Sequence, residues 1–376
     1  MTGVLTGVRI IEFAGLGPGP FCAMMLADHG AEVIRIDRPG AENRINNPTL
    51  RSRKSIVLNL KDPQGIEIAK DLLKTADGLI EGLRPGVMEK LGLGPEDISE
   101  INPSLVYGRM TGWGQTGPYA HVAGHDINYI ALSGILHTVG EKGKKPIAPV
   151  NYLGDFGGGG MMLAFGMVSA LLAVKNGATG QVVDCAMTDG SAVLMASVWG
   201  FYAHDLWVDK RGSNLLDGAA HFYDTYETKD GLYVSIGSIE PKFYNLLLEK
   251  TGLSEDADFH AQRDQTKWPD LSSRLEVIFK TKTRDEWCEI MEGTDICFAP
   301  VLSMKEAPHH PHNKARGTFI DVEGKIQPAP SPRFSVSGEV DPRLAPHAGQ
   351  DTEAVLSELG LSSDEIENLK MNGSIY

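Results

Sequence analysis

Two short segments of the sequence hold side chains that could transfer protons. Gly124-His125-Asp126 places an imidazole beside a carboxylate, and Asp155 lies shortly before the glycine run Gly157 to Gly160. Histidine is the side chain best suited to proton transfer near neutral pH. A glycine-rich turn that opens a helix lets a ligand approach backbone N–H groups and favours negative charge. Alone, the histidine could be structural and the aspartate a helix cap; together they predict an enzyme with two proton-transfer groups and a place for a developing anion such as an enolate oxygen.

Basic residues gather in the first part of a chain whose formal net charge is -14. They are Arg35, Arg38, Arg44, Arg51, Arg53, Lys54 and, further on, Arg84. A ligand with several phosphates would suit them, because guanidinium groups offer a fixed fork of donors to phosphate oxygens. A solvated loop with surface charges is the alternative, which spacing alone leaves open. The loop from Ala14 to Pro20 lacks GxGxxG spacing, so a nicotinamide dehydrogenase is not favoured.

Strand and helix patterns alternate through this part of the chain. Apolar runs predict strands at 8–13, 32–37, 55–60, 78–83, 105–110 and 180–185, with helices at 21–29 and 62–75. Repeated strand–helix units favour an α/β fold with a mostly parallel sheet and helices on both faces. The uncharged stretch 156–174 has nearly the length of a membrane span, but its glycine-rich start and charged flanks favour a buried core helix over a span.

The pattern changes after residue 187. A long helix is predicted over 187–208, followed by a hairpin of strands 222–227 and 232–236 with its turn at Asp230-Gly231. Helical patterns follow at 242–250, 271–280 and 284–291. We predict a linking helix and connection over 187–224 and a smaller α+β domain over 225–300. The remainder is rich in proline and glycine and has short helical patterns near 353–359 and 363–369.

Composition argues against several classes of protein. A hydrophobic content of 42% and a charged content of 22% fit a soluble globular protein. The acidic net charge argues against nucleic acid or an anionic membrane surface as a partner. The cysteines lack CxxC spacing and the N-terminus lacks a signal-peptide pattern, so we expect reduced thiols in the cytoplasm. The histidines His309, His310 and His312 lack a matching cysteine or carboxylate spacing, so no metal site is expected.

A series of motifs in a fixed order carries a resemblance over nearly the whole chain. They are GVRIIEFAGLGPGPFCAMMLADHGAEVIRIDRP, RKSIVLNLK, LRPGVMEKLGLGPEDI, RMTGWGQTGPY, GHDINYIALSGIL, NYLGDFGGGG, GQVVDCAMTDGSAVL, HFYDTYETKDGLYVSIGSIEPKFY and APVL. The chain resembles the class III CoA-transferase family, and within it the α-methylacyl-CoA racemases. This resemblance implies a Rossmann-like large domain built from both chain ends, with a CoA-binding N-terminal part at 1–186 and a C-terminal part at 301–376. It also implies a smaller domain and an interlocked homodimer.

The resemblance also implies an activity and residue roles. The activity is racemisation of 2-methylacyl-CoA thioesters through an enolate, with His125 and Asp155 as the acid/base groups and Glu240 orienting the histidine. Backbone N–H groups near Gly157 and Gly158 would stabilise the enolate oxygen. CoA would be bound as part of the substrate, and no metal or redox cofactor is needed. The expected contacts to the CoA phosphates are Arg38 and its basic neighbours Arg35, Lys54 and Arg84.

Two other activities stay open from the sequence. In the transferases of this family the aspartate matching Asp126 is a nucleophile that forms a mixed anhydride with the acyl group. A CoA-transferase is therefore the alternative, and a non-catalytic CoA-thioester binding protein is a third possibility.

Overall fold

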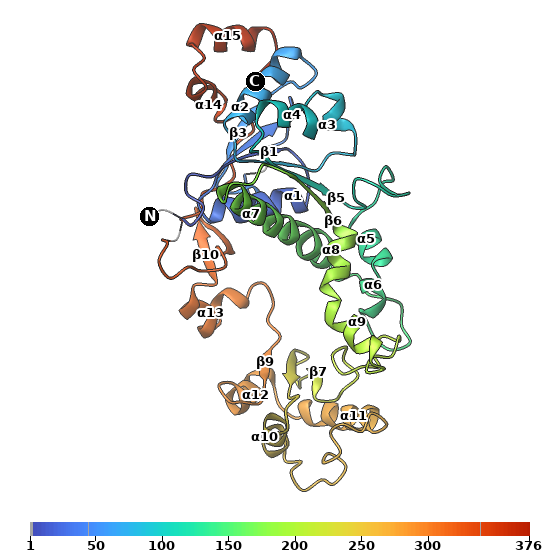
Figure 1. The fold of residues 1–376 in the computed structure, drawn as a ribbon. Coiled ribbons are helices and arrows are strands. Elements are labelled where there is room, and N and C mark those ends of the chain that lie inside the picture. Colours follow the sequence, from blue (N-terminus) through green and yellow to red (C-terminus); the bar gives the residue numbers. More distant parts are fainter. Residues whose placement is uncertain (1–2, 44, 339) are drawn as a thin grey trace. The chain divides into compact units, whose positions relative to one another are not determined.

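The chain forms two compact units in the computed structural model, which describes residues 3–43, 45–338 and 340–376. The first unit comprises the described residues of Met1–Ser133, Val150–Met195 and Ala315–Tyr376, so it draws on both ends of the chain. The second comprises Gly134–Pro149 and Ala196–Lys314. The second unit therefore includes segments on either side of the predicted 225–300. Figure 1 shows the elements of both units.

A parallel six-stranded sheet is the centre of the first unit. Its strands are β1 (Arg9–Phe13), β2 (Glu32–Asp37), β3 (Lys54–Val57), β4 (Gly78–Glu81), β5 (Val106–Thr111) and β6 (Val182–Ala186). Every neighbouring pair is parallel, in the order β3-β2-β1-β4-β5-β6. This is the doubly wound order of dinucleotide-binding folds, in which ligands bind where the strand order reverses, between β1 and β4. The predicted parallel α/β fold is confirmed.

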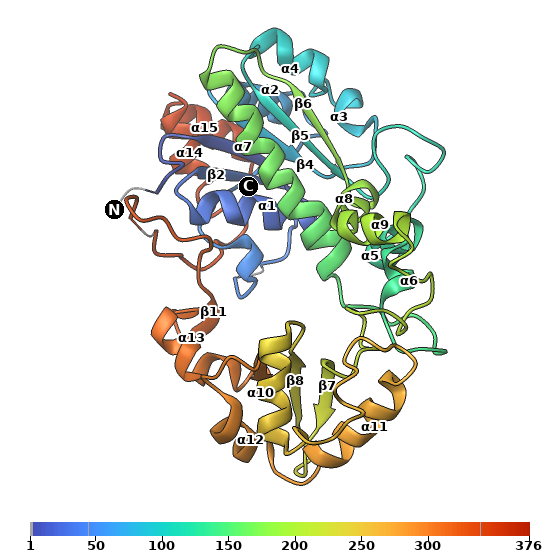
Figure 2. The same cartoon turned by 60° about the horizontal axis from the view of Figure 1, so that its bottom comes forward.

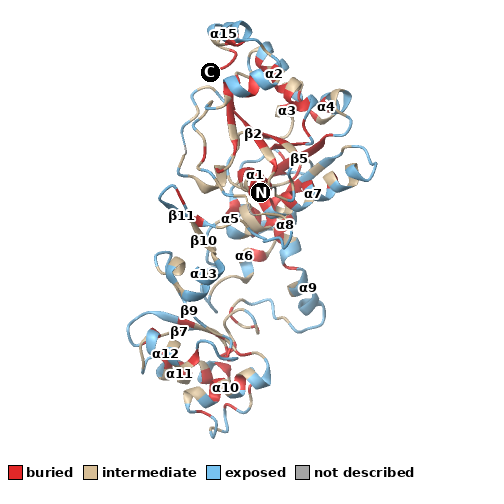
Figure 3. Cartoon of the chain, turned by 90° about the vertical axis from the view of Figure 1, so that its left-hand side faces the viewer, coloured by how far each residue is buried: buried red, intermediate tan, exposed pale blue. Residues whose placement is uncertain are grey.

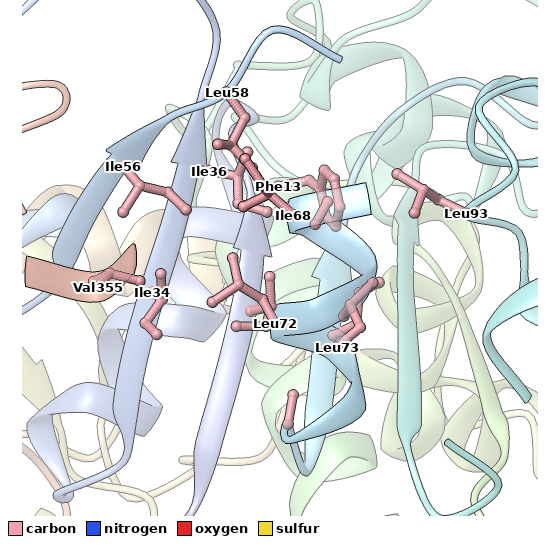
Figure 4. Close-up of a cluster of buried hydrophobic side chains, with 14 of the residues drawn as sticks. Phe13, Ile34, Ile36, Ile56, Leu58, Ile68, Leu72, Leu73, Leu93 and Val355 are labelled. Carbon is pink, nitrogen blue, oxygen red and sulfur yellow. The ribbon is translucent and has the colours of Figure 1, made fainter. Parts of the chain in front are cut away.

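Apolar side chains cover both faces of this sheet. On one face, α2 (Pro63–Lys74) packs Ile68, Leu72 and Leu73 against strand residues such as Ile34 (Figure 4). Helices α14 (Thr352–Glu358) and α15 (Ser363–Met371) join that core from the far end of the chain. On the other face lie α1 (Pro18–Asp28) and α7 (Met162–Lys175). Figure 2 shows α7 crossing the sheet beside α1.

The helix that contains α7 begins earlier than the sequence predicts. A π-helical segment, η2 (Tyr152–Met161), leads directly into α7. By length and composition alone, Tyr152–Lys175 could cross a membrane. One face of α7, with Leu163, Met167 and Ala170, is nevertheless buried in the core. The glycines therefore lie inside the helix rather than in a turn before it.

The predicted helix over 187–208 is two helices. Helix α8 (Met187–Leu194) belongs to the first unit, and α9 (Ala196–Ala203) to the second. Met195 closes α8 and is buried, whereas no residue of α9 is buried (Figure 3). The sequence places no glycine or proline at Met195, so its helical pattern continues across the break.

The second unit has an antiparallel three-stranded sheet with helices around it. The hairpin of β7 (Tyr223–Glu227) and β8 (Tyr233–Gly237) is confirmed, and β9 (Phe298–Pro300) pairs with β8. Helices α10 (Pro241–Thr251), α11 (Trp268–Phe279) and α12 (Arg284–Met291) pack aromatic and aliphatic side chains into one core.

The remaining elements of the two units are short. They are α3 (Val87–Lys90), α4 (Pro95–Ile101), α5 (Asp126–Leu132), α6 (Ile135–Thr138), α13 (Pro311–Arg316), β10 (Phe319–Val322), β11 (Lys325–Pro328) and two short 3-10 turns at Pro48–Leu50 and Ala307–His309.

Candidate functional site

Two cavities lie at the carboxyl ends of the strands in the first unit, where the strand order reverses. One of about 620 Å³ is lined by the loops after β1 and β2 and includes Arg38. The other, of about 360 Å³, includes His125 and Arg84. Both are lined by Leu16 and Leu83, from the loops that follow β1 and β4. The cavities are therefore neighbours at the position where doubly wound folds bind their ligands.

His125 stands directly before α5 with an exposed side chain. Its backbone N–H donates to Asn128 Oδ1 at 3.0 Å, and the Asn128 N–H donates to the His125 carbonyl at 2.8 Å. The preceding residue, Gly124, accepts a hydrogen bond from the Tyr129 hydroxyl. The Tyr129 ring packs edge-on against Trp113 with centroids 4.7 Å apart. These contacts fix the backbone that presents the imidazole to the smaller cavity.

Asp155 lies half-buried in η2, close enough to His125 for the charge of the imidazole to act on its carboxyl. Burial raises the pKa of Asp155 above its usual value. The Asn151 side chain opposes this by donating to Asp155 Oδ2 at 2.9 Å, and the charge of His125 also opposes it, whereas the charge of Asp126 adds to it. A Cβ on Gly17 would lie 3.0 Å from Asp155 Oδ2, so the carboxyl also borders the loop before α1. The structure thus brings His125 and Asp155 into one electrostatic environment.

Asp126 is buried and contacts the backbone of the segment that carries Asp155. Its Oδ1 accepts the Asp155 N–H at 2.7 Å. A Cβ on Gly154 would overlap that same oxygen, so a glycine is needed beside it. The predicted trio of His125, Asp126 and Asp155 therefore meets at the junction of α5 and η2.

The glycine run Gly157 to Gly160 lies inside the helix, and not in a turn that opens it as the sequence predicts. Because the helix begins at Tyr152, Gly157 and Gly158 do not offer the unpaired N–H groups of a helix terminus. A Cβ on Gly158 would lie 2.6 Å from the backbone nitrogen of Ser191, so this glycine lets η2 approach α8 closely. The unpaired N–H groups of this helix belong to the residues just after Asn151.

The predicted basic residues divide into two groups. Arg38 and Arg84 are exposed at the cavities, and neither forms an ion pair with any residue that the structure describes. Arg35 lines the larger cavity, but its Nη1 bonds Glu12 at 2.6 Å and its Nε bonds Asp37 at 3.0 Å. Lys54 lies outside the residues that line either cavity and pairs with Glu32 and Glu358 at 2.7 and 2.9 Å.

The buried members of the basic cluster are structural. Arg51 pairs with Asp28, and Arg53 pairs with Glu12. Buried charges need partners of opposite sign, and here the partners come from α1 and β1. Arg44 lies outside the described residues. As contacts for phosphates, Arg35 and Lys54 are therefore weaker candidates than the sequence predicts.

Glu240 belongs to the second unit, where it is exposed and directly precedes α10. Its role toward His125 stays a prediction from the resemblance.

Of the three clustered histidines, His310 Nε2 lies 2.6 Å from Glu292. Among the described residues, no group of three or more histidine, cysteine or acidic side chains could hold a metal ion.

Sequence reasoning missed two residues of the site. Asn151 bonds the Asp155 carboxyl across one turn of η2, and its spacing of four residues was a usable signal. Tyr129 fixes the loop before His125 through the hydrogen bond from its hydroxyl to Gly124. Its ring packs so closely on Gly112 that a Cβ there would overlap it. That contact joins separate segments, so no local pattern reveals it.

Known proteins are similar to this chain over nearly its whole length. The relatives include human alpha-methylacyl-CoA racemase, 44% identical over 97% of this chain and 96% of that protein, and the mouse protein of that name, 46% identical over the same shares. Mouse succinyl-CoA:glutarate CoA-transferase is 31% identical over 99% of this chain and 90% of its own length.

Solved structures match the fold. The crystal structure of a CAIB/BAIF family protein from Brucella suis superposes with a TM-score of 0.84 at 26% identity, covering 96% of this chain and 100% of that one. Residues 5–352 match the sequence profile of CoA-transferase family III. With this profile and relatives at 44–46% identity, the chain belongs to CoA-transferase family III.

Proposed function

We propose that this chain is an isomerase that racemises 2-methylacyl-CoA thioesters by 1,1-proton transfer at C2. The observation that carries the proposal is that His125, at the smaller cavity, lies close enough for its charge to act on the half-buried Asp155 carboxyl, whose pKa is raised by burial. The relatives with the highest identity given above are named alpha-methylacyl-CoA racemase, which supports this chemistry for the same family.

The proposed reaction uses one group as base and the other as acid. The base takes the C2 proton, and the electron pair of the C–H bond moves into the thioester carbonyl to form an enolate. The acid on the other side then donates a proton to C2, and the carbonyl re-forms with inverted configuration. His125 and Asp155 exchange roles with the direction of reaction. A raised pKa suits Asp155, because a group that must both donate and accept works best with a pKa near the working pH.

Stabilising the enolate oxygen must supply much of the remaining acceleration, since acid–base help is typically worth about 10²–10⁴-fold. The N–H groups of the first turn of η2, after Asn151, are the donors without an intrahelical partner. We assign the enolate oxygen to this turn rather than to Gly157 and Gly158. The reaction needs no metal or redox cofactor, because the thioester itself acidifies the C2 proton.

CoA would lie along the two cavities of the first unit. Arg38 at the larger cavity and Arg84 at the smaller one form no ion pair with the described residues, so both are free to meet phosphates. The loop that carries Arg84 is held by Glu81, which accepts the Leu83 N–H at 2.6 Å and the Arg109 Nε at 2.9 Å. This loop is therefore positioned before any ligand binds.

We also propose that the active protein is a homodimer, as the resemblance implies. The helix of η2 and α7 exposes Met161, Phe165, Val168 and Leu172 at helical spacing, with Phe165 74% exposed. Such a stripe is typical of a surface covered by a partner, and a second copy of the chain is the partner we assign to it.

All four cysteines are free thiols, which fits a reducing compartment such as the cytoplasm.

A CoA-transferase is the second candidate, favoured by the relative of that activity at 31% identity. Its nucleophile would be Asp126. Heavy-water exchange at C2 of a 2-methylacyl-CoA separates the two: a racemase incorporates deuterium without a second carboxylic acid. A transferase instead moves CoA to an added carboxylate and forms an intermediate that hydroxylamine traps.

A further inference from the structure

The carboxylate of Asp126 is turned into the protein. The residue is 7% exposed, and Oδ1 accepts the Asp155 N–H at 2.7 Å. Gly154, which precedes Asp155, has no side chain to displace that oxygen. The carboxylate therefore joins the start of α5 to the start of η2.

This hydrogen bond uses an N–H that the helix itself does not pair. Because η2 begins at Tyr152, the N–H of Asp155 lies among the first groups of the helix, which have no carbonyl one turn back. An ionised acceptor makes a shorter and stronger hydrogen bond than a neutral one, and the distance fits such a bond. One dipeptide thus fixes both reacting groups: His125 through its own backbone and Asp155 through the neighbouring carboxylate.

We propose that Asp126 is a positioning residue for proton transfer, whose carboxylate holds the main chain of Asp155 beside His125. The inference rests on the proposed racemase function and assigns Asp126 a role other than that of a nucleophile. A nucleophile must reach the acyl carbon, yet Oδ1 is bonded to the Asp155 backbone. The second oxygen, Oδ2, is buried and has no hydrogen-bond donor in the part of the chain that the structure describes. Attack through either oxygen would require this junction to open.

The charge of Asp126 has a second effect on its neighbour. It raises the pKa of Asp155, in addition to the larger effect of burial, while Asn151 and the charge of His125 lower it. Tyr129, from α5, is the other titratable group that faces the two carboxylates, and its own pKa is raised by burial and by both of them. The loop before α1 borders Asp155 at Gly17, which has no charge. Removing the charge of Asp126 should therefore lower the pKa of Asp155.

Three variants of the full-length chain test this role through heavy-water exchange at C2. Asp126→Asn keeps an oxygen acceptor for the Asp155 N–H but removes the charge. Asp126→Ala removes the acceptor, and Gly154→Ala leaves every functional group in place while displacing the Asp126 carboxylate. For each variant, kcat and KM are measured from pH 5 to pH 9, and circular dichroism checks the fold.

Asp126→Asn is expected to exchange deuterium within about tenfold of the wild-type kcat, with the Asp155 limb of its pH profile moved to lower pH. Asp126→Ala and Gly154→Ala are each expected to lose about 100-fold in kcat with KM changed less than threefold, because a shift of about 1 Å in a catalytic group has an effect of that size. If Gly154→Ala does not fold, the two Asp126 variants decide the question.

Two results would overturn the proposal. One is an Asp126→Asn variant as inactive as Asp126→Ala, together with a wild-type acyl-enzyme that hydroxylamine traps. The other is an Asp126→Ala variant that keeps the wild-type kcat and pH profile. Failure of the racemase function itself is distinguishable, because wild-type protein would then show no exchange at all.

Discussion

Asn151 Nδ2 donates a hydrogen bond of 2.9 Å to Asp155 Oδ2 across one turn of the π-helical segment. The bond favours the charged form of the carboxyl and opposes the upward shift of the Asp155 pKa that burial produces. The acid strength of Asp155 thus depends on its burial and on this neutral neighbour, in addition to the charges of Asp126 and His125.

Asn151→Ala should move the pH profile of exchange. Without the amide donor, the pKa of Asp155 rises further, so the limb of the kcat profile that reports Asp155 moves to higher pH. The pH dependence of deuterium incorporation measures this. Tyr152→Phe is the matched control, since it changes an exposed neighbour in the same turn and should leave the profile in place. A profile that stays fixed in Asn151→Ala would exclude this coupling.

Arg38 and Arg84 should affect CoA binding, and Lys54 should not. Arg38→Ala or Arg84→Ala is expected to raise KM for an acyl-CoA about tenfold with little change in kcat, because a charge-assisted contact to phosphate is typically worth about 1.5–3 kcal/mol and is reduced by exposure. Lys54→Ala, whose partners are Glu32 and Glu358, is expected to change KM less than twofold. Steady-state kinetics at low and high salt checks both. A rise in KM for Lys54→Ala equal to that for the arginine variants would show that Lys54 also contacts the phosphates.

Phe165→Glu should disrupt self-association. Phe165 is 74% exposed in the stripe on α7, and a carboxylate there would have to be buried unpaired in a dimer. Analytical ultracentrifugation of the wild type should give a dimer mass, and the variant should shift toward monomer at micromolar concentration. Val277→Glu is the control, because Val277 is 69% exposed on α11, a helix of the second unit that contributes no residue to that stripe. A monomeric wild type would contradict the dimer proposal.

His221 should make the second unit less stable in mild acid. Its side chain is fully buried, Nε2 lies 2.7 Å from the Tyr244 hydroxyl, and burial lowers its pKa to about 4. The folded state therefore binds fewer protons than the unfolded state between about pH 6.5 and pH 4, so stability falls as the pH drops through that window. Between pH 7.5 and pH 5 the loss from this group is about 2 kcal/mol.

Chemical denaturation at both pH values measures that loss. His221→Gln should reduce the difference between the two conditions, whereas His260→Gln, at an exposed histidine, should leave it unchanged. An unchanged pH dependence in His221→Gln would show that other groups cause the acid sensitivity.

The sequence predicts the parallel sheet well because β1, β2 and β4 are short apolar runs between turn signals, and burial on both faces requires that pattern. It places the start of the helix too late, after Asp155, because a run of glycines is typical of a turn. In the structure these glycines lie inside the helix and allow η2 and α8 to pack closely. It also misses the break at Met195, where no helix-breaking residue stands.

The sequence identifies the side chains that meet at the candidate site, but not the ion pairs around it. His125, Asp126 and Asp155 stand in two short motifs, so local spacing finds them. The ion pairs of Arg35 and Lys54 depend on Glu12, Glu32 and Glu358, which lie on other elements and come near only in the folded chain. Spacing along the sequence carries no information about such partners.

Interconversion in heavy water tests the central claim most directly. Each enantiomer of a 2-methylacyl-CoA is incubated with the wild type, and both should reach the same mixture with deuterium at C2. His125→Ala and Asp155→Ala should each slow interconversion about 10²–10⁴-fold, while each still exchanges the enantiomer whose C2 proton faces the remaining base. Wild-type protein that neither exchanges nor interconverts either enantiomer would contradict the account.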